Sequence, residues 1–167
     1  MKTVQINFTF YSPEIRIPGA DFWSCNGLHA LSEPYGLKPS AWFQIHRPEA
    51  LPKETESHLK WLYSPHDFPV YVNPRTYAWE LNGEYGFPEE FNFQPLPMDE
   101  LDALWTWPWP VGYSCTFSYQ IAMAIHLGYE VIDMSDVRLS DQREKTLEAP
   151  NVLLWVGEAH KRGIKVL

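Results

Sequence analysis

The spacing of apolar and polar residues predicts a chain that alternates strands with helices. Val4, Ile6, Phe8 and Phe10 alternate with polar residues, as in a strand with one buried face. Short apolar runs predict further strands at 21–25, 41–45 and 68–72. The segment 54–63 is patterned as a helix, with Leu59 and Leu62 on one side.

The last third of the chain gives the clearest pattern. Residues 117–127 form an apolar helical segment that ends at Gly128, and 131–134 is a short buried strand. Residues 150–161 are amphipathic, and a strand at 164–167 follows. The predicted inner face of that helix consists of Val152, Trp155, Val156 and Ala159. Repeated helix–glycine–strand units favour a three-layer Rossmann-like α/β fold: a mostly parallel sheet with helices on both faces. Ligands bind such sheets beyond the carboxyl ends of the strands.

The segment 73–110 interrupts this regularity within what we expect to be one domain spanning 1–167. It is rich in Pro, Gly and aromatic residues and contains one predicted short helix near 98–104. A loop of this length is often a lid or a binding loop. An irregular cover over the core, or over a contact between subunits, is an equal alternative, and Trp105, Trp107 and Trp109 fit either interpretation.

Amino-acid composition and charge limit the kinds of partner that the chain is expected to bind. The chain has 167 residues, 45% of them hydrophobic, and a formal net charge of −8. Because it lacks basic runs, broad binding to a nucleic-acid backbone or to an anionic membrane is not expected. No apolar run is long enough to span a membrane, and the N-terminus lacks the pattern of a signal peptide. Two cysteines do not make a disulfide framework. We therefore expect a cytoplasmic protein with reduced thiols.

The main candidate for chemistry is the turn that opens the helix at 117–127. Ser114, Cys115 and Thr116 place two hydroxyls and a thiol where a helix start gathers backbone N–H groups and the positive end of the helix dipole. Such a turn is suited to a phosphate group. The alternative is simple capping of the helix, which the local sequence favours by about two to one.

Two other polar segments fall at predicted strand ends. Asn26 and Gly27 follow an early strand, where an Asn can contact a ribose or a base, or adopt a left-handed turn. Arg138 and Arg143 lie in the polar loop after the strand 131–134 and are candidates for phosphate contacts. Pairing with neighbouring acids in a solvated loop is the commoner role for such arginines.

Histidines are the weakest candidates. His46 ends one predicted strand and His66 precedes another, and either is a candidate general acid or base. A structural or surface role is favoured for each by roughly three to one. No HExxH or CxxC spacing is present, so we expect neither a metal ion nor a cofactor.

Taken in order, several segments resemble small Rossmann-like proteins of bacteriophages. They are Phe22-Trp23-Ser24-Cys25-Asn26-Gly27-Leu28, Ala41-Trp42-Phe43-Gln44-Ile45-His46, Ser114-Cys115-Thr116 with the apolar helix after it, Pro150-Asn151, and Arg162-Gly163-Ile164-Lys165-Val166. The layout is also similar, more distantly, to bacterial sialyltransferases and a related domain of unknown function. The resemblance covers most of the chain outside 73–110, and it implies location in a bacterial host cell.

The resemblance implies a nucleotide or nucleotide-sugar ligand, with metal-independent glycosyl transfer as the activity. Asn26, Cys115 and Thr116 would hold the nucleotide, and a His or Tyr would serve as base. The chain departs from the family by lacking glycine in the turn at 10–14 and after Cys115-Thr116. These losses support a rival hypothesis, a non-catalytic module that binds a protein partner or a nucleotide signal. Association of identical chains is left open.

Overall fold

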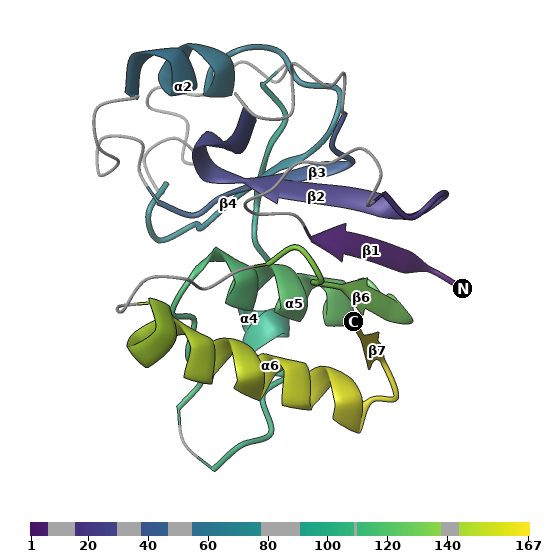
Figure 1. Ribbon diagram of the computed structural model, residues 1–167. Helices are drawn as coiled ribbons and strands as arrows, with labels where there is room; N and C mark the ends of the chain where they lie inside the picture. Colours follow the sequence, from purple (N-terminus) through teal and green to yellow (C-terminus); the bar gives the residue numbers. More distant parts are fainter. Residues whose placement is uncertain (7–15, 30–37, 47–54, 78–90, 109, 138–143) are drawn as a thin grey trace. The chain divides into compact units, whose positions relative to one another are not determined.

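The computed structural model describes residues 1–6, 16–29, 38–46, 55–77, 91–108, 110–137 and 144–167 (Figure 1). These residues form two compact units. The first consists of Met1–Asp21 and Pro97–Leu167, and the second of Phe22–Leu96. Phe8, Phe10 and the turn at 10–14 lie outside the described residues.

The first unit contains three parallel strands in the order β1-β6-β7. Their bounds are Thr3–Ile6, Val131–Asp133 and Lys165–Val166. Val4 lies opposite Ile132, and Ile132 opposite Val166. All of β1 beyond Thr3 is buried, Gln5 included, so the strand is covered on both faces, unlike the half-exposed strand predicted from its alternation. The side-chain oxygen of Gln5 accepts a hydrogen bond from the backbone N–H of Ile17.

Helices α4 (Met98–Asp102), α5 (Thr116–His126) and α6 (Ala149–Lys161) belong to the same unit. Helix α5 packs on α4, on α6 and on β1. It is apolar and almost wholly buried, and it ends at Gly128, whose φ of 70° is a left-handed value that favours glycine. One turn of π-helix, η6 (Glu144–Glu148), leads into α6, and Pro150 lies in the first turn of α6.

The second unit contains four parallel strands in the order β5-β4-β3-β2. Their bounds, in chain order, are β2 Asp21–Cys25, β3 Ala41–Gln44, β4 Val70–Val72 and β5 Phe93–Pro95. A short 3₁₀ helix, η2 (Asn26–Leu28), follows β2, and α2 (Thr55–Leu62) precedes β4. The core of this unit contains Trp42, Leu62, Val70, Val72 and Tyr77.

The predicted fold class is confirmed. Every strand pair described within the two units is parallel, and helices lie between several of the strands along the chain, as in a three-layer Rossmann-like α/β fold. Among the described residues, the structure has no helix of the length and apolarity that a membrane span requires.

Three local expectations differ in part from the structure. Strand β5 lies in a segment predicted to be irregular apart from one helix, because its sequence Phe-Gln-Pro is too short to show a period. In α2 Leu62 is buried as predicted, but Leu59 is only half-buried and His58 is buried. In α6 Val152, Trp155 and Ala159 are buried as predicted, while Val156 is half-buried and Glu158 is also buried. Both helices therefore bury a polar side chain that the apolar pattern did not predict.

Candidate functional site

Helices α5 and α6 of the first unit begin at the edge of the sheet where the parallel strands end. Each helix leads into a strand, β6 or β7, that runs parallel to β1. A helix that returns the chain to the amino end of a parallel strand begins at the carboxyl edge of the sheet. The predicted turn at Ser114–Thr116 therefore lies at the edge where parallel α/β sheets bind ligands.

Asn151, in the first turn of α6, holds this turn in place. Its side-chain oxygen accepts hydrogen bonds from the backbone N–H of Ser114 at 3.1 Å and from the hydroxyl of Ser118 at 2.6 Å. The Ser114 hydroxyl lies 3.3 Å from the same oxygen and 3.2 Å from the carbonyl oxygen of Glu148. The amide nitrogen of Asn151 donates to the carbonyl of Gly112 at 2.9 Å. The Asn151 side chain thus links Gly112 and Ser114, on either side of Tyr113, to α6.

Aromatic packing fixes the other side of the turn. The ring of Tyr113 stacks on Tyr119 of α5, with centroids 4.3 Å apart, and on Trp155 of α6 at 5.3 Å. The Tyr113 hydroxyl donates to a carboxylate oxygen of Asp102 at 3.0 Å. The indole N–H of Trp155 donates to the carbonyl of Gly112. The backbone on both sides of Ser114 is consequently held by α4, α5 and α6.

Three side chains at the start of α5 are buried. Cys115 is the N-cap residue of α5, in extended conformation, and it makes no side-chain capping bond. Cys115 and Thr116 are buried, and Ser118 is fully buried. Burial raises the pKa of the Cys115 thiol, an effect that hydrogen bonding to Ser118 partly offsets. A protonated, buried thiol is a poor nucleophile, so this cysteine is suited to packing rather than to covalent chemistry.

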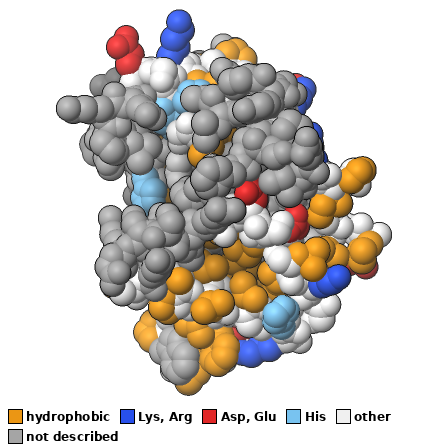
Figure 2. Space-filling view, in the orientation of Figure 1, with side chains coloured by type: hydrophobic (Ala, Val, Ile, Leu, Met, Phe, Trp, Pro, Cys, Tyr) orange, Lys and Arg blue, Asp and Glu red, His pale blue; other side chains and the backbone are white. Residues whose placement is uncertain are grey.

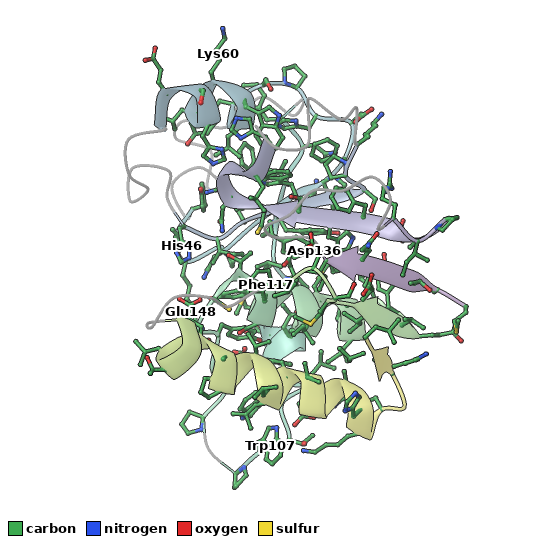
Figure 3. All side chains as sticks on the ribbon, viewed as in Figure 1. His46, Lys60, Trp107, Phe117, Asp136 and Glu148 are labelled. Carbon is green, nitrogen blue, oxygen red and sulfur yellow. The ribbon has the colours of Figure 1, made fainter. Side chains whose placement is uncertain are left out.

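Two carboxylates lie at the same edge, at the end of β6 and just after it. Asp133 and Asp136 are both buried, and Asp133 accepts a hydrogen bond from the backbone N–H of Ser135 at 3.0 Å. Figure 3 labels Asp136 together with Phe117 at the start of α5 and Glu148 at the end of η6. Negative charge beside β6 disfavours an anionic ligand there. The α5 start is the part of this edge that suits a phosphate.

Asn26 and Gly27 belong to the second unit, at the end of β2. Asn26 has a φ of 51°, a left-handed backbone, and its amide nitrogen lies 3.8 Å from the sulfur of Cys25. A Cβ added at Gly27 would meet no atom within 4 Å. The structure thus shows the turn conformation for Asn26 and open space beside Gly27.

The predicted histidines differ in their surroundings. The His46 side chain is exposed, and the backbone carbonyl of this residue accepts bonds from Gln44 and Tyr77. His66 is half-buried, donates to the carbonyl of Leu62 at 3.3 Å, stacks on Phe68 and meets Trp61 at a tilt. Burial lowers its pKa, an effect that the backbone hydrogen bonds partly offset. Arg138 and Arg143 lie outside the described residues.

Several polar residues that hold the structure together were not predicted as such. Asn151 stands out in the sequence only through the Pro150-Asn151 motif, in which Pro150 marks a helix start. Three polar residues of the second unit, His29, Gln44 and His58, are buried and bonded to one another. His58 stands four residues before Leu62, on the same side of the helix, which was the available signal. The described residues contain no group of three or more His, Cys, Asp or Glu that could hold a metal ion.

Comparison with known proteins finds no matching family model, curated protein or solved structure. The resemblance to phage Rossmann-like proteins and to sialyltransferases therefore stays a prediction from sequence.

Proposed function

We propose that this chain binds a nucleotide or a nucleotide-sugar, with a phosphate group at the start of α5. The observation that supports this is the network around Asn151, which fixes the backbone at Ser114 from both sides. A helix start held rigidly at the carboxyl edge of a parallel sheet presents backbone N–H groups and a positive dipole end in a constant geometry. Preorganisation of this kind lowers the entropic cost of binding.

Binding is better supported than glycosyl transfer. Ser114 and Ser118 already bond to Asn151, and the Cys115 thiol is buried with a raised pKa. None of these three groups is therefore arranged as a nucleophile. Phosphate contacts would come from the backbone N–H groups of Cys115–Phe117 and, after rotation of the buried Thr116 side chain toward the ligand, from its hydroxyl.

A thermal-shift screen of nucleoside monophosphates, nucleoside diphosphates and nucleotide-sugars tests binding. A ligand present at 100 times its Kd stabilises the fold by about 2.7 kcal/mol. For a chain of this length the melting temperature should rise by roughly 5–10 °C. If none of these compounds raises the melting temperature, the proposed function is wrong.

Matched variants then locate the ligand. Thr116→Val removes the hydroxyl while keeping the shape of the side chain, and it should abolish most of the shift. Thr3→Val makes the same change at the amino end of β1, the opposite edge of the sheet, and should leave the shift intact. An equal shift in both variants would exclude the Thr116 hydroxyl from the site.

The second unit is tested separately. Asn26→Gly removes the amide while preserving the left-handed backbone at φ 51°. Asn92→Gly is its control, because Asn92 has a φ of 54° and precedes β5. A loss of the ligand shift in Asn26→Gly alone would assign a ligand contact to Asn26. Equal ligand-induced melting shifts in the two variants would mean that Asn26 only shapes the turn.

Docking of a partner protein is the second candidate function, and one observation favours it. Leu147 of η6 and Leu153 of α6 are 64% and 67% exposed, and Figure 2 shows hydrophobic side chains gathered over this part of the first unit. Clustered exposed apolar side chains mark contact surfaces. Sedimentation of the wild-type chain and of Leu153→Lys tests for contact with a second copy. Identical monomeric behaviour would exclude self-association through this helix.

A further inference from the structure

A chain of hydrogen bonds crosses the interior of the second unit and is not used by the proposed function. Gln44 ends β3, His58 lies in α2, and His29 follows η2 directly. The Nε2 atom of His58 lies 3.0 Å from Oε1 of Gln44, and its Nδ1 atom lies 3.2 Å from Nδ1 of His29. All three side chains are at least 94% buried. Three separate elements are therefore joined through one imidazole.

The partners determine where each proton lies. The amide nitrogen of Gln44 donates to the carbonyl of His46 at 2.6 Å, which turns its oxygen toward His58. An amide oxygen only accepts, so Nε2 of His58 carries the hydrogen. In a neutral ring the Nδ1 atom of His58 is then an acceptor, and Nδ1 of His29 must donate to it. In the neutral pair, this hydrogen bond therefore runs from His29 to His58.

The surroundings offer no compensating negative charge among the described residues. Trp61 stacks on both rings, with centroids 5.0 Å from His29 and 6.2 Å from His58. From the packed elements, His29 is the titratable group that faces His58, and Gln44 is uncharged. His66 contacts Trp61, and Lys60 of α2 is exposed and projects away from the cluster (Figure 3).

A proton added to His58 puts a hydrogen on its Nδ1 atom as well as on Nε2. The 3.2 Å contact then persists only if His29 moves its own hydrogen from Nδ1 to Nε2. In either case a positive charge is placed among side chains that are at least 94% buried, which is costly. We propose that the buried His29–His58 pair is a proton-operated latch that holds the turn after β2 on α2 at neutral pH and loosens on acidification.

The direction of the pH effect follows from linkage. Burial, and secondarily the neighbouring His29, lower the pKa of His58 from 6.5 to about 4. A depressed pKa means that the unfolded chain binds the proton more tightly, so stability is complete above pH 6.5 and is lost as the pH falls toward 4. With these values, the unfolding equilibrium constant rises roughly 30-fold between pH 7.5 and pH 5 through His58 alone.

Urea unfolding of the full chain at pH 7.5 and pH 5 tests the latch. The wild-type increase in the unfolding constant should be roughly 30-fold larger than that of His58→Gln. His29→Gln should also show a reduced increase. His46→Gln is the matched control, because His46 is an exposed histidine of the same unit, and it should behave as wild type. His66 contributes equally to all four proteins, so their comparison isolates the pair. An unchanged pH dependence in His58→Gln would overturn the proposal.

A measurement on the wild-type chain remains decisive if a variant fails to fold. Nitrogen-15 NMR of the imidazoles at pH 7.5 should show His58 with its hydrogen on Nε2 and His29 with its hydrogen on Nδ1. On acidification, His58 should remain neutral until the signals of α2 and of the turn after β2 change together. A mixture of tautomers at pH 7.5, or charging of His58 near pH 6.5 without such changes, would overturn the latch.

Discussion

The side-chain oxygen of Asn151 accepts a hydrogen bond from the hydroxyl of Ser118 at 2.6 Å, and this contact joins the first turn of α6 to the first turn of α5. Ser118 is fully buried. Water therefore cannot replace the acceptor that Asn151 supplies. This one amide therefore links the two helix starts directly, and the candidate phosphate site lies at that link.

Replacing Asn151 with Ala should destabilise the fold by about 3 kcal/mol, since it leaves the Ser118 hydroxyl and the Ser114 N–H without their acceptor. Ser118→Ala should cost about 1 kcal/mol, because Asn151 keeps its bond to Ser114. Urea unfolding of both single variants and the double variant measures the coupling, which we expect to be about 1 kcal/mol or more. Strictly additive losses would show that the two side chains act independently.

Gly112 should tolerate no side chain. A Cβ added there would lie 3.0 Å from the amide nitrogen of Asn151, which itself donates to the Gly112 carbonyl. Gly112→Ala should therefore displace Asn151 and lower stability by about 1–3 kcal/mol. Gly27→Ala is the control, because a Cβ at Gly27 meets no atom within 4 Å and should change stability little. Thermal or urea unfolding compares them, and equal stabilities would contradict the close approach at Gly112.

The Cys115 thiol should react slowly in the native protein. Burial raises its pKa, and the thiolate is the reactive form. Alkylation by iodoacetamide at pH 8, followed by mass spectrometry, should be at least roughly tenfold slower at Cys115 than at a cysteine introduced by Thr146→Cys, an exposed position. Labelling should become fast in urea. Equal rates in the native protein would mean that the turn before α5 opens readily.

The sequence was sufficient to predict the α/β class and most of the described elements. Long apolar runs and glycines at helix ends identify α5, β6, α6 and β7. Burial requires apolar residues and a left-handed turn favours glycine, so both features are visible in the sequence. Strand β5 leaves no such trace, since three residues with one proline show no period. It is defined by its pairing with β4, a long-range contact.

The candidate site was only partly predictable for a related reason. The turn at Ser114–Thr116 is visible as a polar break before an apolar helix, but its side-chain partners come from a helix more than thirty residues later. The local sequence cannot show that the side-chain oxygen of Asn151 accepts hydrogen bonds from the hydroxyls of Ser114 and Ser118. The burial of polar residues such as His58 and Glu158 cannot be predicted from hydrophobic spacing. Hydrogen bonds, rather than apolar character, make their burial tolerable.

Glu158 is a fully buried carboxylate of the first unit, and its partners surround both carboxylate oxygens. Oε1 accepts from the backbone N–H and the hydroxyl of Thr106, at 3.0 and 2.6 Å, and from Lys161 at 3.2 Å. Oε2 accepts from Arg162 at 2.6 Å. Burial by itself would raise the pKa of Glu158, but these hydrogen bonds outweigh it and lower the pKa from 4.5 to about 2.

Because the pKa of Glu158 is depressed in the folded state, its contribution is complete above pH 4.5 and is lost as the pH falls toward 2. Glu158→Gln should therefore cost about 3 kcal/mol at pH 7 and much less at pH 2.5, where the wild type has lost most of this stabilisation. Glu100→Gln is an exposed control and should change little at either pH. Urea unfolding at both pH values measures the difference. A deficit that stays constant between them would mean that Glu158 acts through its shape and neutral hydrogen bonds, not through its charge.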